Sequence, residues 1–283
     1  MAKENVLVVG LGEVGQPLFE LLKENPNFVV YGLDLDEKKM HNIGQCEADL
    51  PSEIDVMHVC IPCSDKTKFV NTIVDYVRRF DPKLLIINST VQLGTTFDVS
   101  KRCGNCLVAH SPVRGVHKNS EYMKKELKRW IKYIGGVTPE AAAQAQKHFS
   151  KLGLKTKVLK SCVETELAKL FETTYRAWMI ACFQEMHRIS RDIGASFDDV
   201  VGFIEDTHNV RHDRPVMFPG VIGGHCQIPN IELFMKTHRS KFLELILESN
   251  KERKEEIKNP EIAEEIEKIK KRAQANEKKV LTP

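Results

Sequence analysis

Three glycines near the start of the chain have the spacing needed to hold a phosphate group. Gly10, Gly12 and Gly15 stand in a G-x-G-x-x-G pattern that follows an apolar strand and opens a helix. The first glycine permits a tight turn, the second lets the backbone approach a pyrophosphate, and the third lets helix and strand pack closely. Together with Glu13 and Val14 they predict a dinucleotide site at a helix N-terminus.

An acidic residue about 20 positions further on completes this fingerprint. Asp34 ends the second predicted strand, where its carboxylate can accept hydrogen bonds from both ribose hydroxyls and would repel a 2′-phosphate. NAD is therefore expected rather than NADP. Asp36 is the competing candidate for this role. The alternatives for the whole domain are a Rossmann-like domain that binds S-adenosylmethionine or one that has lost its nucleotide.

Two further strand ends are expected at the cofactor, because ligands of open α/β sheets bind at the carboxyl ends of the strands. The third strand leads into Cys60, Ile61 and Pro62, and the fourth leads into Ser89 and Thr90. These five residues are assigned to the cofactor site, with Cys60 beside the nicotinamide half.

Two Cys-x-x-Cys pairs have the spacing of zinc ligands, Cys60 with Cys63 and Cys103 with Cys106. Cys60 ends a predicted strand, and a zinc ribbon would need a differently folded loop. Small buried residues are therefore the favoured interpretation of both pairs, no metal is expected, and Cys63 could still touch the cofactor.

The elements that must position these residues alternate along the first half of the chain. Apolar runs predict strands and amphipathic stretches predict helices, for example Gly15–Lys23 and Lys66–Phe80. This alternation predicts an α/β fold, a doubly wound Rossmann domain whose mostly parallel sheet is covered on both faces by helices. Gly135 and Gly136 predict a turn before a helix start. The predicted strands are residues 6–9, 28–33, 56–61, 84–88, 107–109, 130–134 and 156–159.

The second half has the pattern of an all-α domain. Residues 162–193 form one long helical pattern, followed by a helix over 197–204, a loop over 207–230 and a helix from about residue 231. We therefore expect a Rossmann domain over 1–157, a helical domain over 158–250 and a charged tail over 251–283. The tail has only a thin apolar stripe, which predicts an exposed helix that could pack on a partner subunit.

Composition is that of a soluble globular protein. The 283 residues are 42% hydrophobic and 29% charged, and a net charge of +3 demands no nucleic-acid partner. No apolar run approaches the roughly 20 residues of a membrane span, and the N-terminus has no signal-peptide pattern. A cytoplasmic protein with reduced thiols is expected, with neither membrane nor nucleic acid as a partner.

A group of histidines in the second half has two interpretations. His208 and His212 are spaced i, i+4, and His225 adjoins Cys226, so these side chains could bind a metal. Downstream prolines predict a loop, which favours the alternative that they line a substrate pocket. Arg211, with His212, could there hold an anionic group.

Another candidate for a substrate contact is Arg114. It follows the predicted strand at 107–109, at the edge of the sheet where ligands bind. An ordinary solvated arginine is the alternative.

Four stretches resemble one family, the nucleotide-sugar 6-dehydrogenases that act on UDP-glucose, UDP-N-acetylmannosamine and GDP-mannose. Gly223, Gly224 and Cys226 in GVIGGHCQIPN resemble its Gly-Gly-x-Cys signature. Lys169 in TELAKLFETTYRAW resembles the lysine of its central helix, and Thr90 in NSTVQLGTT resembles a threonine near the reacting carbon. YIGGVTPEAA resembles its Gly-Gly turn. The resemblance covers roughly residues 4 to 245, so a short form without the third, nucleotide-sugar-binding domain is expected.

The resemblance implies NAD-dependent oxidation of a primary alcohol or aldehyde, of a sugar or nucleotide-sugar. Cys226 would attack the aldehyde to give a thiohemiacetal, whose oxidation gives a thioester that water hydrolyses to an acid. Lys169 would favour the thiolate and stabilise the oxyanion. The family's central helix forms a dimer interface, so a homodimer through residues 162–193 is expected.

Three positions depart from the family pattern. Asn230 replaces an aspartate that serves the base chemistry, Thr173 replaces an asparagine, and Val113 replaces a glutamate. An amide does not titrate near neutral pH, so Asn230 cannot act as a general base. The histidines that could supply a replacement base are His110, His208, His212 and His225.

An NAD-dependent dehydrogenase is the leading interpretation. A non-catalytic NAD-binding sensor or scaffold is the first alternative, and a transferase that uses another Rossmann ligand is the second. The candidate catalytic residues are Cys226, Lys169, Thr90, Asn230 and His225, and the candidate substrate residues are Arg114, Thr173, Arg211, His212, Gly223 and Gly224.

Overall fold

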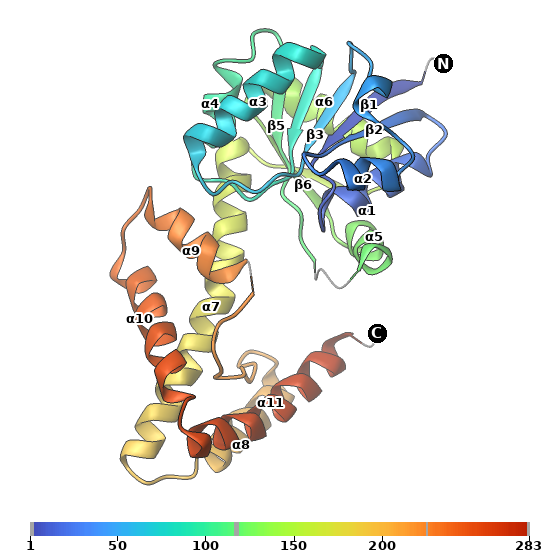
Figure 1. The fold of residues 1–283 in the computed structure, drawn as a ribbon. Coiled ribbons are helices and arrows are strands. Elements are labelled where there is room, and N and C mark those ends of the chain that lie inside the picture. Colours follow the sequence, from blue (N-terminus) through green and yellow to red (C-terminus); the bar gives the residue numbers. More distant parts are fainter. Residues whose placement is uncertain (1–2, 116–118, 225, 282–283) are drawn as a thin grey trace. The chain divides into compact units, whose positions relative to one another are not determined.

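The computed structural model describes residues 3–115, 119–224 and 226–281, in two compact units (Figure 1). The first unit is Met1–Lys169 and the second is Leu170–Pro283, so the boundary falls within one long helix. Each unit has its own hydrophobic core, and each is described by itself.

The first unit is built on a seven-stranded sheet in the order β2-β1-β3-β4-β5-β6-β7. Neighbouring strands are parallel except β5 and β6, which are antiparallel. The predicted Rossmann fold with a mostly parallel sheet is thus confirmed. The strands are β1 (Glu4–Val9), β2 (Phe28–Leu33), β3 (Val56–Val59), β4 (Leu84–Ile87), β5 (Leu107–His110), β6 (Lys132–Gly136) and β7 (Thr156–Val158).

The strand order creates a switch point beside β1. The chain leads from β1 to β2 on one side and then crosses to β3 on the other, so right-handed crossovers place α1 and α3 on opposite faces. The loop after β1 therefore opens at the crevice where ligands of such sheets bind. The helices of this unit are α1 (Gly15–Lys23), α2 (Glu37–Asn42), η1 (Glu47–Asp49), α3 (Lys66–Phe80), α4 (Thr95–Ser100), α5 (Ser120–Arg129) and α6 (Pro139–Lys151).

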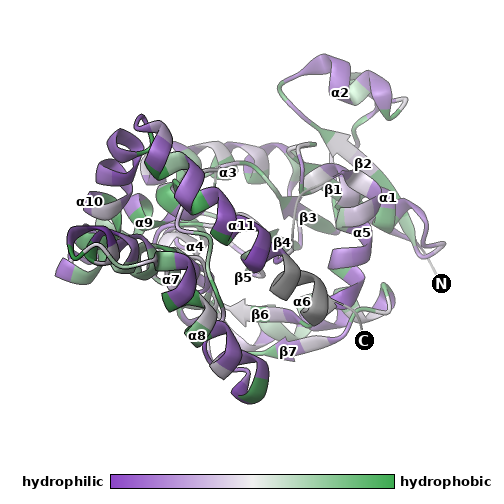
Figure 2. Cartoon of the chain, turned by 90° about the horizontal axis from the view of Figure 1, so that it is seen from below, coloured by the Kyte–Doolittle hydropathy of each residue, from purple (hydrophilic) through white to green (hydrophobic). Residues whose placement is uncertain are grey.

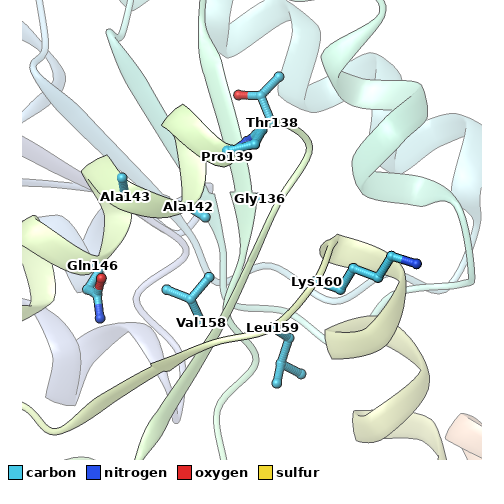
Figure 3. A pocket seen from close by; sticks show the side chains of 9 residues that line it. All are labelled: Gly136, Thr138, Pro139, Ala142, Ala143, Gln146, Val158, Leu159 and Lys160. Carbon is cyan, nitrogen blue, oxygen red and sulfur yellow. The ribbon is translucent and has the colours of Figure 1, made fainter.

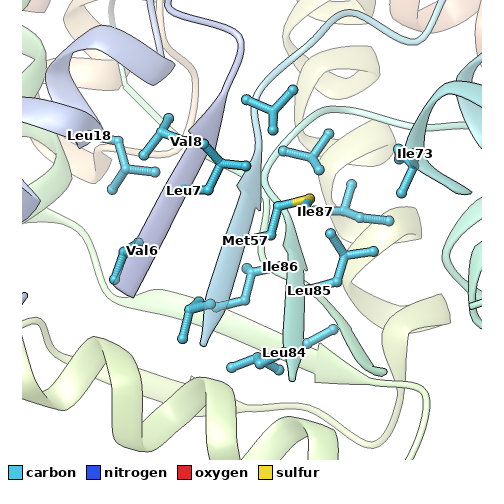
Figure 4. Close-up of a cluster of buried hydrophobic side chains, with 14 of the residues drawn as sticks. Val6, Leu7, Val8, Leu18, Met57, Ile73, Leu84, Leu85, Ile86 and Ile87 are labelled. Atoms are coloured by element: carbon cyan, nitrogen blue, oxygen red, sulfur yellow. The ribbon is translucent and has the colours of Figure 1, made fainter. Parts of the chain in front are cut away.

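Continuous apolar runs fill the core of this unit, as expected for strands that are buried on both faces. Leu7 of β1, Met57 of β3 and Leu85 of β4 are paired in register across the sheet and fully buried (Figure 4). Leu18 of α1 and Ile73 of α3 are buried in the same cluster. This core fixes the strand ends that carry the candidate cofactor residues.

The two glycines of β6 differ from the predicted turn, because the strand runs through both of them. A Cβ on Gly135 would lie 2.2 Å from the carbonyl oxygen of Ser161, and one on Gly136 would lie 2.4 Å from that of Thr138. Close packing against the starts of two helices therefore explains the pair. The predicted helix start is confirmed, since Thr138 caps α6 by accepting from the N–H of Ala141 at 3.1 Å.

The second unit consists of helices, and the long helix predicted over 162–193 is confirmed as α7 (Cys162–Asp192). The predicted loop over 207–230 is shorter, because α8 continues to Arg211 and α9 begins at Gln227. Among the described residues, no helix combines the length and apolar character that a membrane span requires. The other helices are α8 (Phe197–Arg211), α9 (Gln227–Met235), α10 (Lys241–Glu256) and α11 (Pro260–Leu281).

The charged tail packs on its own chain, so the expectation of an exposed helix is wrong for its apolar side. Ile269 of α11 is fully buried in one cluster with Phe183 of α7 and Phe197 of α8. Arg272 holds the same helix to α8 by donating to both carboxylate oxygens of Asp198 at 2.8 and 3.0 Å. Figure 2 shows the hydrophilic residues that alternate with this stripe along α11. A thin apolar stripe is enough to hold α11 against α7 and α8, because ion pairs flank the stripe.

Candidate functional site

The glycine loop after β1 has the geometry that a dinucleotide requires. Gly10 has a φ of +89°, and a Cβ there would lie 3.0 Å from the backbone of Cys60. A Cβ on Gly15 would lie 1.7 Å from the carbonyl oxygen of Gly10, so α1 can start here only with glycine. No atom lies within 4 Å of the position a Cβ would take on Gly12. A hollow of about 280 Å³ adjoins this open backbone, lined by Leu11, Gly12, Glu13, Gln16, Pro17, Asn119 and Ser120.

The carboxylate of Asp34 lies beside this loop. It accepts the N–H of Leu11 at 2.7 Å and that of Asp36 at 2.9 Å, and it pairs with Lys39 at 3.2 Å. Burial opposes ionisation, but these hydrogen bonds and the ammonium group lower the pKa of Asp34. The side chain of Asp36 caps α2 by accepting the N–H of Lys38. The structure therefore places Asp34, and not Asp36, at the glycine loop.

The exits of β3 and β4 are tied together. The hydroxyl of Ser89 donates to the carbonyl oxygen of Ile61 at 2.6 Å, so two residues predicted at the cofactor are in contact. Cys60, between β3 and Ile61, meets the glycine loop at Gly10. Burial raises the pKa of the Cys60 thiol to about 12, so this cysteine is a neutral packing residue.

Glu166 of α7 holds the loop that carries Thr90. Its carboxylate accepts the N–H of Gly94 at 2.7 Å, the N–H of Thr96 at 2.8 Å and the hydroxyl of Thr96 at 2.6 Å. Lys169 follows Glu166 by one helical turn on α7. One helix segment of the first unit thus anchors the Thr90 loop and presents the candidate lysine. Sequence analysis missed Glu166, although it lies in the same TELAK stretch.

His110 at the end of β5 is not available as a base. The ring is fully buried, and burial lowers its pKa to about 3. In the neutral ring Nε2 donates to the carbonyl oxygen of Ser89 at 3.1 Å, because a carbonyl can only accept, and Nδ1 lies 2.8 Å from the hydroxyl of Thr165. With both nitrogens occupied, His110 is a structural link between the exits of β4 and β5.

Within the second unit, the candidate nucleophile begins α9. Cys226 is exposed at the N-cap position, and Asn230 follows one turn later. The side-chain amide of Asn230 donates to the hydroxyl of Thr173 on α7 at 3.3 Å. The two residues that depart from the expected family pattern are thus in contact with each other, and both are buried.

Of the predicted substrate residues, Arg114 belongs to the first unit and the others belong to the second. Gly223 and Gly224 are exposed, and Gly224 has a φ of +77° with open space where a Cβ would lie. Arg211 and His212 end α8 and are exposed. The guanidinium of Arg114 donates to the carbonyl oxygen of Ile131 at 2.7 Å and lies 5.1 Å from the ring centroid of Trp130 and 5.0 Å from that of Tyr133. His225 lies outside the described residues.

The possible metal ligands do not form a site in the described part of the chain. No group of three or more His, Cys, Asp or Glu side chains is arranged there to hold an ion. His208 and His212 are neighbours, with ring centroids 5.9 Å apart, and His208 accepts the N–H of Arg214. Cys103 and Cys106 flank a turn, and burial raises the pKa of the Cys106 thiol to about 12.

A second hollow, of about 270 Å³, lies between α6 and β7 (Figure 3). None of the residues that line it belongs to the predicted site. The lining residues are Gly136, Thr138, Pro139, Ala142, Ala143, Gln146, Val158, Leu159 and Lys160.

Comparison with known proteins shows what the second half of the chain is similar to. The model of the central domain of the UDP-glucose/GDP-mannose dehydrogenase family matches residues 163–252, which include Lys169 and Cys226. The chain is also 28% identical to the UDP-N-acetyl-D-mannosamine dehydrogenase of Methanocaldococcus jannaschii, over 79% of this chain and 59% of that protein. The second half of the chain is thus similar to the central domain of the nucleotide-sugar dehydrogenases.

Solved structures share the fold of this chain. The UDP-N-acetylmannosamine dehydrogenase of Pyrococcus horikoshii superposes with a TM-score of 0.74 at 22% identity, over 87% of this chain and 68% of that one. The Staphylococcus aureus enzyme of the same name superposes with a TM-score of 0.70 at 23% identity, over 87% and 67%. The chain spans 59% of the length of its Methanocaldococcus jannaschii relative.

Proposed function

We propose that this protein is an NAD-dependent oxidoreductase that oxidises a primary alcohol or aldehyde of a nucleotide-sugar. The observation that carries the proposal is the glycine loop, where Gly12 is open, Gly10 and Gly15 permit no side chain, and Asp34 lies alongside. This arrangement fits a pyrophosphate against the start of α1 and a ribose at the end of β2. Similarity to the nucleotide-sugar dehydrogenases supports both the cofactor and the reaction class.

The substrate proposal starts from the relatives. The relatives from Methanocaldococcus jannaschii and Pyrococcus horikoshii are UDP-N-acetyl-D-mannosamine dehydrogenases. Exposed glycines beside Cys226 would let a sugar carbon approach the thiol closely. A nucleotide-sugar of this class is therefore the first substrate to test, with Arg211, His212 and Arg114 as candidates to meet its charge.

The chemistry assigned to the chain's own residues is nucleophilic and electrostatic. NAD, when bound, supplies the hydride acceptor for oxidation. Cys226 would form a bond from its sulfur to the aldehyde carbon. A second oxidation would convert this thiohemiacetal to a thioester, and water would then release the acid with the thiol as leaving group. By the family resemblance, Lys169 would supply positive charge for the thiolate and for the developing oxyanion, and the N-terminus of α9 favours negative charge at Cys226. His208 and His212 are the described candidates for the base that takes the alcohol proton, since His110 is fully engaged.

The direct test follows NAD reduction at its absorbance band. We expect the purified protein to reduce NAD with UDP-N-acetyl-D-mannosamine or another nucleotide-sugar, and not with free sugars or small hydroxy acids. No turnover with any nucleotide-sugar, while calorimetry shows that NAD binds, would contradict the dehydrogenase proposal.

Asp34→Asn is expected to weaken NAD binding by about 1–3 kcal/mol, because the ribose hydroxyls lose a charged acceptor. Calorimetry with NAD measures the change. Asp36→Asn is the matched control, since asparagine also caps helices and this side chain serves α2. Unchanged affinity in Asp34→Asn would assign the adenosine end of the site to other residues.

A homodimer through α7 is part of the proposal. An exposed stripe on that helix includes Phe171, Tyr175, Cys182 and Ile189, and Ile193 just beyond its end continues it. These residues recur at four and seven positions, which is the spacing of one helix face. We also place the protein in the cytoplasm, where its eight cysteines would be kept reduced.

One observation favours a second candidate function, a non-catalytic NAD-binding sensor. The hydrogen bond between Asn230 and Thr173 engages two positions where the family uses catalytic polar groups. NAD binding without turnover in the assay above would favour this candidate.

A further inference from the structure

Lys132 is a buried cation that the proposed mechanism does not use. It begins β6, and the residue is only 5% exposed. Its Nζ donates to the carbonyl oxygens of Ser111 at 2.7 Å and Pro112 at 3.3 Å, and to Oδ1 of Asn88 at 3.4 Å. The ring of Phe149 lies 5.3 Å from the same nitrogen. Two of these acceptors follow β5 and the third follows β4, so one amine bridges two strand exits.

A chain of buried side chains fixes the orientation of the Asn88 amide. The carboxylate of Glu4 can only accept, so Nδ1 of His148 donates to it at 3.3 Å. In a neutral ring Nε2 of His148 must then accept from Nε2 of His58 at 2.9 Å. Nδ1 of His58 in turn accepts from the amide nitrogen of Asn88 at 3.0 Å. Every donor points toward Glu4, which leaves the amide oxygen of Asn88 facing Lys132.

The bridged exits carry the candidate site. Asn88 immediately precedes Ser89 and Thr90, and Ser111 immediately follows His110. His110 donates to the carbonyl oxygen of Ser89, which is a second link between the same two exits. Movement of Lys132 would therefore be transmitted to the backbone of Ser89 and Thr90.

We propose that Lys132 is a positioning residue that holds the exits of β4 and β5, and with them Ser89 and Thr90, in the arrangement that receives the cofactor. This inference rests on the proposed function for the identity of the cofactor. The placement of the two strand exits is tested without cofactor, and therefore separately from the proposed function.

The protonated amine matches its surroundings better than the neutral one. An ammonium group has three N–H donors for the three oxygen atoms named above, whereas a neutral amine has two and turns a lone pair toward the third. Burial lowers the pKa of Lys132 to about 7, and the charges of Lys169 and Arg114 lower it further. The thiol of Cys60, which also faces Lys132, is neutral at this pH. The other titratable groups facing it are His58 and His110, both neutral. The exits are therefore expected to shift as the pH rises through neutrality.

Nuclear magnetic resonance of the full chain without cofactor tests the coupling. With ¹³C-labelled lysine, we expect one side-chain signal to titrate near neutral pH and to be absent in Lys132→Met. The backbone amide signals of Ser89 and Thr90 should follow the same midpoint in the wild type and lose that transition in Lys132→Met. Lys125→Met, at an exposed position on α5, is the matched control and should keep it.

Binding provides the second measurement. We expect Lys132→Met to weaken NAD binding about tenfold at pH 6, where the wild-type amine is protonated, and Lys125→Met to leave it unchanged. The proposal is overturned if Lys132 titrates while the Ser89 and Thr90 signals stay constant, or if Lys132→Met folds and leaves both these signals and NAD binding unchanged. If Lys132→Met does not fold, the wild-type titration alone decides the question. Absence of turnover with every nucleotide-sugar would count against the proposed function and not against this coupling.

Discussion

Cys226→Ala is expected to lower formation of the carboxylic acid product at least about 1,000-fold, as removal of a catalytic nucleophile does in other enzymes. The thiol stands at the N-cap of α9, where the helix N-terminus favours negative charge. Alanine keeps the backbone but cannot bond to the aldehyde carbon. NAD affinity should stay the same, because the glycine loop belongs to the first unit.

Mass spectrometry of the products, with NAD reduction followed in parallel, measures this effect. Cys46→Ala is the matched control, because Cys46 is also exposed and lies outside the proposed site. Acid formation at the wild-type rate in Cys226→Ala would contradict the covalent role. If Cys226→Ala reduces NAD but yields the aldehyde as its final product, Cys226 is needed for the second oxidation and not for the first.

Acidification from pH 7 to pH 5 is expected to lower the free energy of unfolding of the first unit by about 4 kcal/mol, from two buried histidines together. His58 and His110 are fully buried. Burial, with the charges of His148 and Lys132, lowers the pKa of His58 well below its ordinary value. Burial lowers the pKa of His110 to about 3.

The sign follows from proton uptake. In the unfolded chain both rings bind protons below about pH 6.5, whereas in the folded chain they remain neutral. Their stabilising contribution is therefore present above the unfolded pKa and is lost as the pH falls toward the folded pKa values. Each ring contributes at most about 1.4 kcal/mol per pH unit in that window. Burial also lowers the pKa of His148, so it acts in the same direction.

Urea unfolding at several pH values, followed by Trp130 fluorescence in a Trp178→Phe background, reports on the first unit. His41→Gln is the control, because His41 is exposed on α2 and should leave the pH dependence unchanged. Replacement of His148 by glutamine should make the dependence shallower. A free energy of unfolding that is constant between pH 7 and pH 5 would show that the buried rings take up protons in the folded state.

Sequence patterns predicted the structure well wherever a single strand, turn or helix was concerned. Continuous apolar runs predicted the strands of the first unit, and glycine spacing predicted the loop after β1, because steric limits on turn and helix start act over a few residues. Periodicity predicted α7 to within one residue at its end. The ends of α8 and α9 were missed, because the prolines and glycines between them indicated a longer loop than the chain forms.

The sequence by itself determined the Rossmann fold, the glycine loop with Asp34, and the residues that resemble the nucleotide-sugar dehydrogenases. Only the tertiary structure decided which polar groups are buried together. It joins Glu4 to Lys132 through a chain of hydrogen bonds and brings the carboxylate of Glu166 to the loop that carries Thr90. It also places Asn230 in contact with Thr173 and packs α11 against α7 and α8. Spacing along the chain describes short-range geometry, whereas these contacts join residues far apart, and a buried polar group must find its partner wherever the fold brings one.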